Sequence, residues 1–598
     1  MRFAEQPIKL RIVAAGGTFM HFDTGRTGPR RPALSLRLGV TGHRHLPSEA
    51  IGSLAAQVET VLGALASAIG GIGGSLDNPF AGGEPNLTIL SQLAVGADQL
   101  VAQVGMASGW SLAAVMPFSP DRFFRDFDEP DRERFVALLD QCEASWHLPG
   151  DGEEAQQAYA LAGEATVAQS DLLIAIWDGA TARGPGGTAD VVDHAIRRGV
   201  PVVHISATGA HDATLLWAGI DSMPSALLHR HNVPRRPADQ ATLTATVEAL
   251  LLSPAEAAER RYLAEFAAER LPRVCLRLEY PVMLAVAGVR PLRRTDLLPA
   301  RSMDAGDALD EAYCWADRLA DAYAQVYRSG SVFNFAAAAA AVLVALLGFL
   351  APHLKLAIVA VELLLIVGLI ANTMIGNRRE WHRRWLDYRY LAEQLRVMRS
   401  LKRLNVATPM TDVAAHLREA RWTDFYAAAI WRQLTPATIA DQPALAALAA
   451  EAIADIKDQI SYHRANSARM HLLDHRLHQA GTLLFHATIA VGLISLVGLA
   501  AGIDLIVSHV KLFTFLSAAL PTVGGALFGI RGQGDFAGAA GRSSRTAARL
   551  ERSAASLCTA PFTLGRTARI MEDAAISMLD DLGEWRAAYT YRKLLIPA

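Results

Sequence analysis

Apolar residues are concentrated in four long runs in the second half of the chain. The first two lie between Phe333 and Asn377, separated by a short connection that contains Pro352, and Glu362 is the only charged residue of the second run. A transmembrane helix needs about 20 apolar residues to cross roughly 30 Å of hydrocarbon, and each run reaches that length. The runs predict four transmembrane helices in two hairpins, at 331–377 and 481–531. Burial in a large soluble core is the alternative.

The N-terminal third alternates apolar strands with helical patterns. Between Leu34 and Val40 leucine or valine occupies every second position, and a glycine turn and a helical pattern follow. The same order recurs at the apolar strands 87–90, 111–117, 171–179 and 201–206. This alternation is typical of a parallel sheet with helices on both faces. We expect a Rossmann-like α/β domain with a mostly parallel sheet, followed by an all-α membrane domain.

The same patterns divide the chain into segments. They are an N-terminal lead (1–32), the α/β domain (33–253), a helical linker (254–330), the first hairpin (331–377), a cytosolic helical region (378–480), the second hairpin (481–531) and C-terminal cytosolic helices (532–598). A helix rich in tyrosine and arginine enters each hairpin, and an arginine-rich helix follows it. A tryptophan comes late in each unit, at Trp422 or Trp585. These features indicate a loose internal repeat.

Charge predicts the orientation of the hairpins. The only lysines or arginines in their connections are Lys355 and Lys511, whereas arginines such as Arg378 and Arg379 cluster at the opposite ends. Because positive residues stay on the cytoplasmic side, both termini and the α/β domain are expected in the cytoplasm. The net charge of −2 gives no basis for a nucleic-acid partner. The four cysteines are far apart and predict neither a disulfide framework nor a metal site.

Glycine-rich turns follow several of the predicted strands, at 39–42, 96–98 and 178–190. The carboxyl ends of parallel strands meet at one edge of a sheet, where α/β proteins bind their ligands. Turns that lead into helices also present backbone N–H groups to a phosphate. We therefore expect these turns to gather into one ligand site.

Several motifs resemble known families. The segments LGVTGHR, SQLAVGAD and SDLLIAIWDG followed by GPGGTADVV resemble the SLOG superfamily of nucleotide-binding Rossmann-like domains, from Ala33 to Ala207. The membrane part is similar to SLATT domains, which are two-helix membrane modules, through QISYHRANSARMHLLDHRL before the second hairpin and RSSRTAARLERSAASL after it. SLATT modules are proposed pore-forming effectors of bacterial anti-phage systems, and SLOG domains are proposed sensors of nucleotide-derived signals.

The resemblance implies a ligand-gated effector in the bacterial inner membrane that binds a nucleotide-derived or NAD-derived signal and no cofactor. It also implies the ligand-facing residues: glycines for close backbone approach, basic side chains for phosphate, and acidic ones for ribose or base. This set is Gly39, Thr41, Gly42, His43, Arg44, Gly96, Ala97, Asp98, Asp178, Gly186, Gly187, Thr188 and Asp190. The alternative is structural, with Gly42 in a turn, Asp98 and Asp190 as helix caps and Arg44 as a surface charge.

Some relatives within the SLOG superfamily are phosphoribohydrolases with a P-G-G-x-G-T-x-x-E loop, whose glutamate supports N-glycosidic cleavage. Here the corresponding loop lacks the x-G pair and has Val191 at the position of the acid, with Asp190 as the nearest carboxylate. General acid–base catalysis needs a carboxylate within reach of the proton. Binding without turnover is therefore expected, and no catalytic residue is assigned. A membrane-anchored nucleotide-processing enzyme and a non-conducting scaffold are the alternatives.

Polar residues inside the apolar runs are the pore candidates. Ionisable residues within a span usually face a bundle interior or an aqueous path. Glu362 from several subunits is expected to form a ring that favours cations, and Asn334 and His486 are weaker candidates. A hydrogen bond of Glu362 within its own hairpin is the alternative. Four helices cannot enclose much of a channel, so we expect a homo-oligomer, taken as a tetramer.

Overall fold

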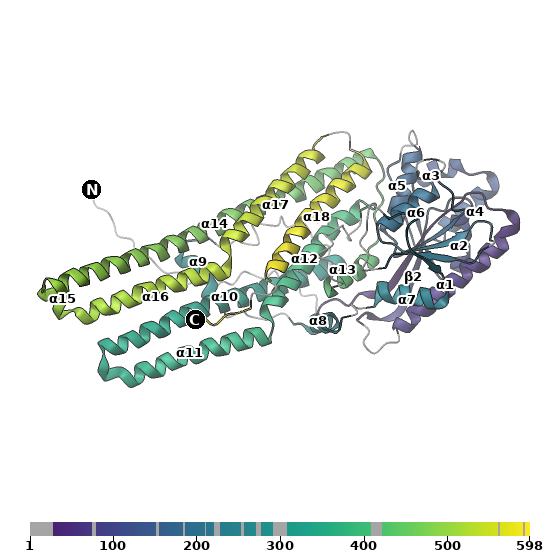
Figure 1. Cartoon of the computed structure of the whole chain (residues 1–598). Coiled ribbons are helices and arrows are strands. Elements are labelled where there is room, and N and C mark those ends of the chain that lie inside the picture. Colours follow the sequence, from purple (N-terminus) through teal and green to yellow (C-terminus); the bar gives the residue numbers. More distant parts are fainter. Residues whose placement is uncertain are drawn as a thin grey trace.

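The computed structural model describes residues 28–73, 79–150, 155–182, 184, 186–209, 211–219, 228–252, 256–270, 277–290, 308–407, 421–559, 562–589 and 593–597. Most of the expected N-terminal lead, residues 1–27, lies outside this set. Figure 1 shows an α/β domain at one end of the molecule and a long helical part that extends away from it. The expected order, an α/β domain followed by a helical part, is confirmed.

The described part of the sheet has eight strands in the order β4-β3-β2-β1-β5-β6-β7-β8. Strands β1 to β6 pair in parallel, and only β7 and β8 pair antiparallel, at one edge. The mostly parallel sheet is thus confirmed, whereas the short strands β4, β7 and β8 were not predicted. The strands are β1 (Ala33–Gly42), β2 (Ala81–Ser91), β3 (Ser111–Met116), β4 (Ala144–His147), β5 (Leu172–Trp177), β6 (Val202–Ser206), β7 (Thr214–Leu216) and β8 (Arg235–Pro237).

Helices cover both faces of the sheet. The alternating apolar residues of β1, Leu36, Leu38 and Val40, are fully buried on the face that α1, α2 and α7 cover. Helices α5 and α6 lie on the opposite face. The bounds are α1 (Ile51–Gly73), α2 (Ala97–Ala107), α5 (Ala155–Ala168), α6 (Thr188–Arg197) and α7 (Gln240–Leu251).

The opposite face is completed by a helix from much later in the chain. Helix α13 (Trp422–Gln433), from the segment between the two hairpins, packs on β1. Leu90 of β2 and Val115 of β3 belong to the same buried hydrophobic cluster as Trp422 and Leu391. The α/β domain and the helical part therefore share one core. The predicted domain limit at residue 253 leaves this helix out.

The helical part contains two hairpins that project away from the α/β domain (Figure 1). Helices α10 (Ala308–Leu350) and α11 (Lys355–Arg378) form the first, and α14 (Gln442–Ala500) and α16 (Val510–Gly534) form the second. Helix α10 contacts α16, so the hairpins lie side by side. The remaining helices of this part are α8 (Ala257–Ala268), α9 (Glu279–Val286), α12 (Trp381–Arg403), α15 (Asp504–Ser508), α17 (Phe536–Leu557) and α18 (Leu564–Tyr589).

Among the described residues, five helices are long and apolar enough to cross a membrane. One of them, Ser48–Gly73, lies in the α/β domain, where 44% of its apolar segment is buried. The corresponding share is 6% for Pro352–Arg378 and 6% for Gln442–Ala500. Length and composition thus identify candidate transmembrane helices. That four of them cross the membrane remains a prediction.

Candidate functional site

Strands β1 and β5 are neighbours at the centre of the sheet. From β1 the strand order continues through β2 and β3 to β4 at one edge, and from β5 it continues through β6 and β7 to β8 at the other. In open α/β sheets, ligands bind in a crevice outside the carboxyl ends of the strands, at the point where the strand order reverses, and here that point lies between β1 and β5. The two ends are tied by a hydrogen bond of 2.9 Å from the His43 backbone N–H to the Ile176 carbonyl. Thr41, at the end of β1, is buried. Gly42 is required for packing, because a Cβ there would lie 2.4 Å from the Ala97 Cβ.

His43 and Asp178 meet at this edge of the sheet. The Asp178 backbone N–H donates to His43 Nε2 at 3.1 Å, and the Asp178 carboxylate Oδ1 lies 3.2 Å from the same nitrogen. The carboxylate also accepts from the Ala180 N–H at 2.9 Å. Both side chains are partly exposed, at 30% for His43 and 38% for Asp178. The pair therefore lies at the surface of the ligand edge.

Arg44 is supported by residues that the sequence did not reveal. Its guanidinium lies 4.6 Å from the ring centre of Tyr159 in α5, while Arg44 itself is exposed. The Tyr159 hydroxyl donates to Asp126 at 2.5 Å, and Arg122 pairs with Asp126 at 2.6 Å. Burial raises the pKa of Tyr159, so its hydroxyl stays a donor. A cation held on an aromatic ring at the crevice is suited to bind an anionic group.

The turn after β2 packs closely against the loop that follows β1. Gly96 has a φ of +88°, and a Cβ there would lie 2.4 Å from the carbonyl oxygens of His43 and Arg44. Ala97 is buried, and its N–H donates to the His43 carbonyl at 3.0 Å. The Asp98 carboxylate is also buried and accepts from the Gln92 N–H at 3.2 Å. Burial raises the pKa of Asp98 to about 7. These three residues shape the loop that carries His43 and Arg44.

The turn after β5 brings Gly186, Gly187 and Thr188 to the same edge, ahead of α6. Gly186 has a φ of +78°, and a Cβ there would lie 2.7 Å from the Ala160 backbone nitrogen. The Gly186 N–H donates to the Asp190 carboxylate at 3.2 Å. Asp190 therefore already occupies one of the backbone N–H groups that the sequence predicts to bind a phosphate. Pro185 lies outside the described residues. Gly39 lies three residues before Gly42 in β1 and packs against Ser170. A Cβ at Gly39 would lie 2.3 Å from Ser170 Oγ.

The structure thus brings His43, Arg44 and Asp178 together at the crevice, and it adds Tyr159. Their charges and donors suit an anionic ligand that also carries hydroxyl groups. The described residues contain no group of three or more histidine, cysteine, aspartate or glutamate side chains that could hold a metal ion.

The three pore candidates lie in different surroundings. Glu362 is partly buried in α11, and His486 is exposed on α14. Asn334 is only 1% exposed, and its amide nitrogen donates to Thr373 Oγ1 and to the Leu595 carbonyl, each at 2.8 Å. The Asn334 amide therefore forms hydrogen bonds within the first hairpin and with the segment 593–597. A pore-facing position remains a prediction for all three residues.

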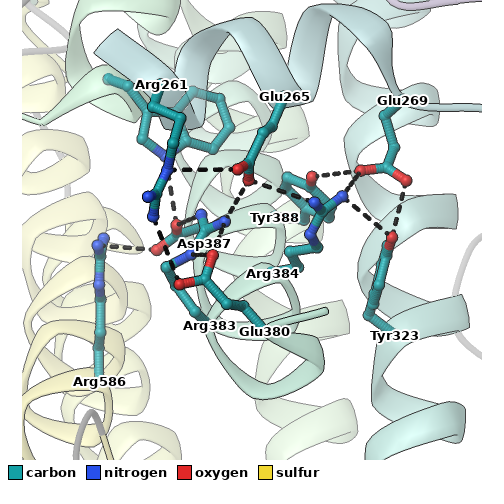
Figure 2. A network of polar contacts seen from close by, with 11 residues as sticks. Arg261, Glu265, Glu269, Tyr323, Glu380, Arg383, Arg384, Asp387, Tyr388 and Arg586 are labelled. Atoms are coloured by element: carbon teal, nitrogen blue, oxygen red, sulfur yellow. Dashed lines mark hydrogen bonds and ion pairs between the residues drawn. The ribbon is translucent and has the colours of Figure 1, made fainter. Parts of the chain in front are cut away.

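A network of ion pairs joins α8, the helix that follows the α/β domain, to the base of the first hairpin (Figure 2). Glu265 of α8 accepts from Arg383 of α12 at 2.6 Å, and Glu269, directly after α8, pairs with Arg384. The Tyr323 hydroxyl of α10 donates to the other oxygen of Glu269 at 2.7 Å. Burial and this hydrogen bond raise the pKa of Tyr323 to about 12. The network holds α8, α10 and α12 together.

The same network reaches α18 through Asp387. This carboxylate is fully buried and pairs with Arg383 at 3.0 Å and with Arg586 at 2.8 Å (Figure 2). Trp422, at the start of α13, donates its indole N–H to Asp387 at 3.3 Å. Because α13 packs on β1, it connects the network at the hairpin base to the sheet.

No protein-family model and no curated protein matches the chain.

Proposed function

We propose that the protein is a ligand-gated membrane effector of a bacterial anti-phage system. The α/β domain would bind a nucleotide-derived signal at the His43–Asp178 crevice on the cytoplasmic side. Helices α10, α11, α14 and α16 would span the inner membrane and, in a homo-oligomer such as a tetramer, open a pore.

The observation that carries this proposal is the position of α13 on the sheet. A ligand gates a protein only if it binds one of two conformations more tightly. Closure of the crevice would move β1 and β5, and α13 packs on β1. Arg432 of α13 also pairs with Asp171, directly before β5, at 2.6 Å. A movement of the central strands thus has a packed path to the helices between the hairpins.

The hairpin surfaces support the membrane half of the proposal. Leu364 of α11 is 71% exposed, and Leu483 of α14 is 69% exposed. Large exposed apolar surfaces mark contact with lipid or protein. The arginines at one end of both hairpins support an orientation with the α/β domain in the cytoplasm.

Dye release from liposomes tests the proposal. Purified protein is reconstituted and exposed to ADP-ribose and to a panel of linear and cyclic nucleotides. We expect leakage with one of these ligands only, and Arg44→Glu should abolish it by repelling the anionic group. Arg236→Glu, on the exposed edge strand β8, is the matched control and should leak like the parent protein. Leakage that is independent of every ligand, or an unchanged response in Arg44→Glu, contradicts the proposal.

Glu362 is tested in the same assay. If carboxylates from several subunits ring the pore, Glu362→Gln should reduce the preference for K⁺ over Cl⁻ in planar bilayers while ligand dependence is kept. An unchanged ion preference would remove Glu362 from the pore.

An N-glycosidic hydrolase is the second candidate, and the His43–Asp178 contact is the observation that favours it. An imidazole beside a carboxylate is a common general-base arrangement. Release of free base from a nucleotide, lost in His43→Gln, would support the enzyme. Binding without release would support the sensor.

A further inference from the structure

Helix α9 (Glu279–Val286) keeps one apolar face uncovered. Leu278, Val282 and Val286 are 49%, 56% and 85% exposed. They follow one another at four-residue spacing and therefore share a face of the helix. Tyr280 and Leu284, on the other side, are 8% and 4% exposed. The proposed gating function does not account for an exposed apolar face in the linker.

The buried face fixes where α9 lies relative to the hairpins. Tyr280 and Leu284 belong to one hydrophobic cluster with Val332 of α10, Leu477 of α14 and Ile530 of α16. These three residues lie at or just before the ends of the apolar runs, within four residues of Arg328, Arg476 and Arg531 respectively. Helix α9 therefore lies at the level where the predicted spans meet their arginine-rich ends.

Both ends of α9 are held in place. Before the helix, the Arg277 carbonyl accepts from the Gln325 side chain of α10 at 2.8 Å. Inside its first turn, the Tyr280 N–H donates to Ser329 Oγ of α10 at 3.2 Å. After the helix, Arg476 of α14 donates to the Ala287 carbonyl. These contacts prevent the helix from turning its exposed face inward.

Arginines lie close to α9, one against its buried side and one just after its last turn. The Arg328 guanidinium lies 5.4 Å from the Tyr280 ring centre, and Arg290 is exposed just after the helix. A short helix with an apolar face and nearby arginines is typical of helices that lie in the plane of a membrane interface. The patch consists of three large side chains, which is far less than the roughly 800 Å² per partner of a standard protein interface.

We infer that α9 lies in the cytoplasmic interface of the membrane, with Leu278, Val282 and Val286 among the lipid acyl chains. The partner is a lipid surface, and the inference rests on the membrane location in the proposed function. In the chain, α9 lies between α8, which belongs to the ion-pair network, and α10, the first helix of the first hairpin. Lipid would thus hold the segment through which movements of the α/β domain reach the first hairpin.

Spin-label accessibility tests this location in the full chain. Cys142, Cys275, Cys314 and Cys558 are first replaced by alanine, and single cysteines are then introduced as Val282→Cys and Val286→Cys. Leu363→Cys, at a position 55% exposed on α11, is the lipid reference, and Ala264→Cys, exposed on α8, is the aqueous reference. Each protein is reconstituted in vesicles of phosphatidylcholine and phosphatidylglycerol. Collisions of the label with O₂ and with a water-soluble nickel chelate are then measured.

We expect the ratio of O₂ to nickel collisions at positions 282 and 286 to be several-fold above that of Ala264→Cys and below that of Leu363→Cys. A ratio equal to that of Ala264→Cys would place the face in water and overturn the inference. Dipolar broadening between labels would instead show a second copy of the chain on this face, which also overturns it. If Leu363→Cys gives the aqueous ratio too, the membrane location itself fails, so the two failures are distinguishable.

Discussion

Glu380 and Asp535 occupy equivalent positions in the two halves of the helical part. Both have a left-handed backbone, with φ of 49° and 43°, and each joins the second helix of a hairpin to the next helix. The order α10, α11, α12, α13 corresponds to α14, α16, α17, α18. The backbone therefore supports the internal repeat that the sequence indicates only loosely.

The left-handed conformation of Glu380 predicts a difference between two substitutions. Both Glu380→Asn and Glu380→Val remove the hydrogen bond from Arg383 Nε, which measures 3.0 Å. Asparagine tolerates a positive φ, whereas a β-branched residue does not. Glu380→Val should therefore be less stable than Glu380→Asn by about 1–2 kcal/mol, measured by denaturant unfolding in detergent. Equal stability of the two variants would show that the backbone relaxes out of this conformation.

Asp387→Ala should be strongly destabilising. It would leave Arg383 and Arg586 without the buried carboxylate that both contact. Removing one partner of a buried ion pair typically costs about 3–5 kcal/mol. Glu551→Ala is the control. Glu551 pairs with Arg464, but the two side chains are 40% and 66% exposed, respectively, so this ion pair should contribute less than about 1 kcal/mol. A loss of similar size in both variants would contradict the role assigned to the network.

The pKa of Asp98 predicts a pH dependence of stability. Burial raises this pKa from 3.8 to about 7, so between these values the folded chain binds a proton that the unfolded chain releases. The contribution is fully present below pH 4 and is lost as the pH rises to about 7, by at most about 4 kcal/mol. Asp98→Asn should weaken this dependence, measured as the change in unfolding midpoint between pH 5 and pH 8. An identical pH profile in the variant would mean that Asp98 is ionised in the fold.

The contacts between the sheet and α13 predict effects of different size for substitutions of two charged residues, Asp171 and Lys402. The Asp171 carboxylate accepts a hydrogen bond from the Arg37 backbone N–H at 2.9 Å. It also forms an ion pair with the Arg432 guanidinium. Lys402 is buried, its ammonium lies 4.3 Å from the Trp431 ring centre, and desolvation lowers its pKa.

Asp171→Asn should therefore destabilise the protein by about 3–5 kcal/mol, because it leaves the buried Arg432 guanidinium without its counter-charge. Lys402→Met removes the ammonium and keeps the volume, but it leaves the buried Gln169 Oε1, which accepts from that ammonium at 2.5 Å, without a donor, and should cost only about 1–3 kcal/mol. Differential scanning calorimetry of both variants measures the two effects. The prediction fails if Lys402→Met is the more damaging change.

The segment 593–597 predicts a second matched pair. Leu594 is 4% exposed and packs with Tyr327 and Trp385, whereas Leu595 is 56% exposed. The Asn377 side chain accepts from the Leu594 N–H and donates to its carbonyl, each at 3.2 Å. Leu594→Ala should cost about 2–5 kcal/mol of stability, and Leu595→Ala should change it by less than about 0.5 kcal/mol. Thermal unfolding in detergent measures both, and equal effects would mean that this segment is not docked.

The sequence by itself determined those features that depend on local periodicity. Alternation along β1 predicts its buried face, because successive side chains of a strand point to opposite sides. The long apolar runs predict helices that match the candidate spans. The glycine turns predict the edge at which His43, Arg44 and Asp178 meet, because parallel strands place their carboxyl ends together.

Only the tertiary structure decided which distant segments complete these elements. Tyr159 supports Arg44, and α13 closes a sheet that ends nearly two hundred residues earlier in the chain. Asn334, a polar residue inside an apolar run, binds the Leu595 carbonyl 261 residues away. Periodicity reports that a residue is buried and does not report its partner, because any apolar face of suitable shape satisfies the same pattern. The partners are fixed by packing and hydrogen bonding in the assembled fold.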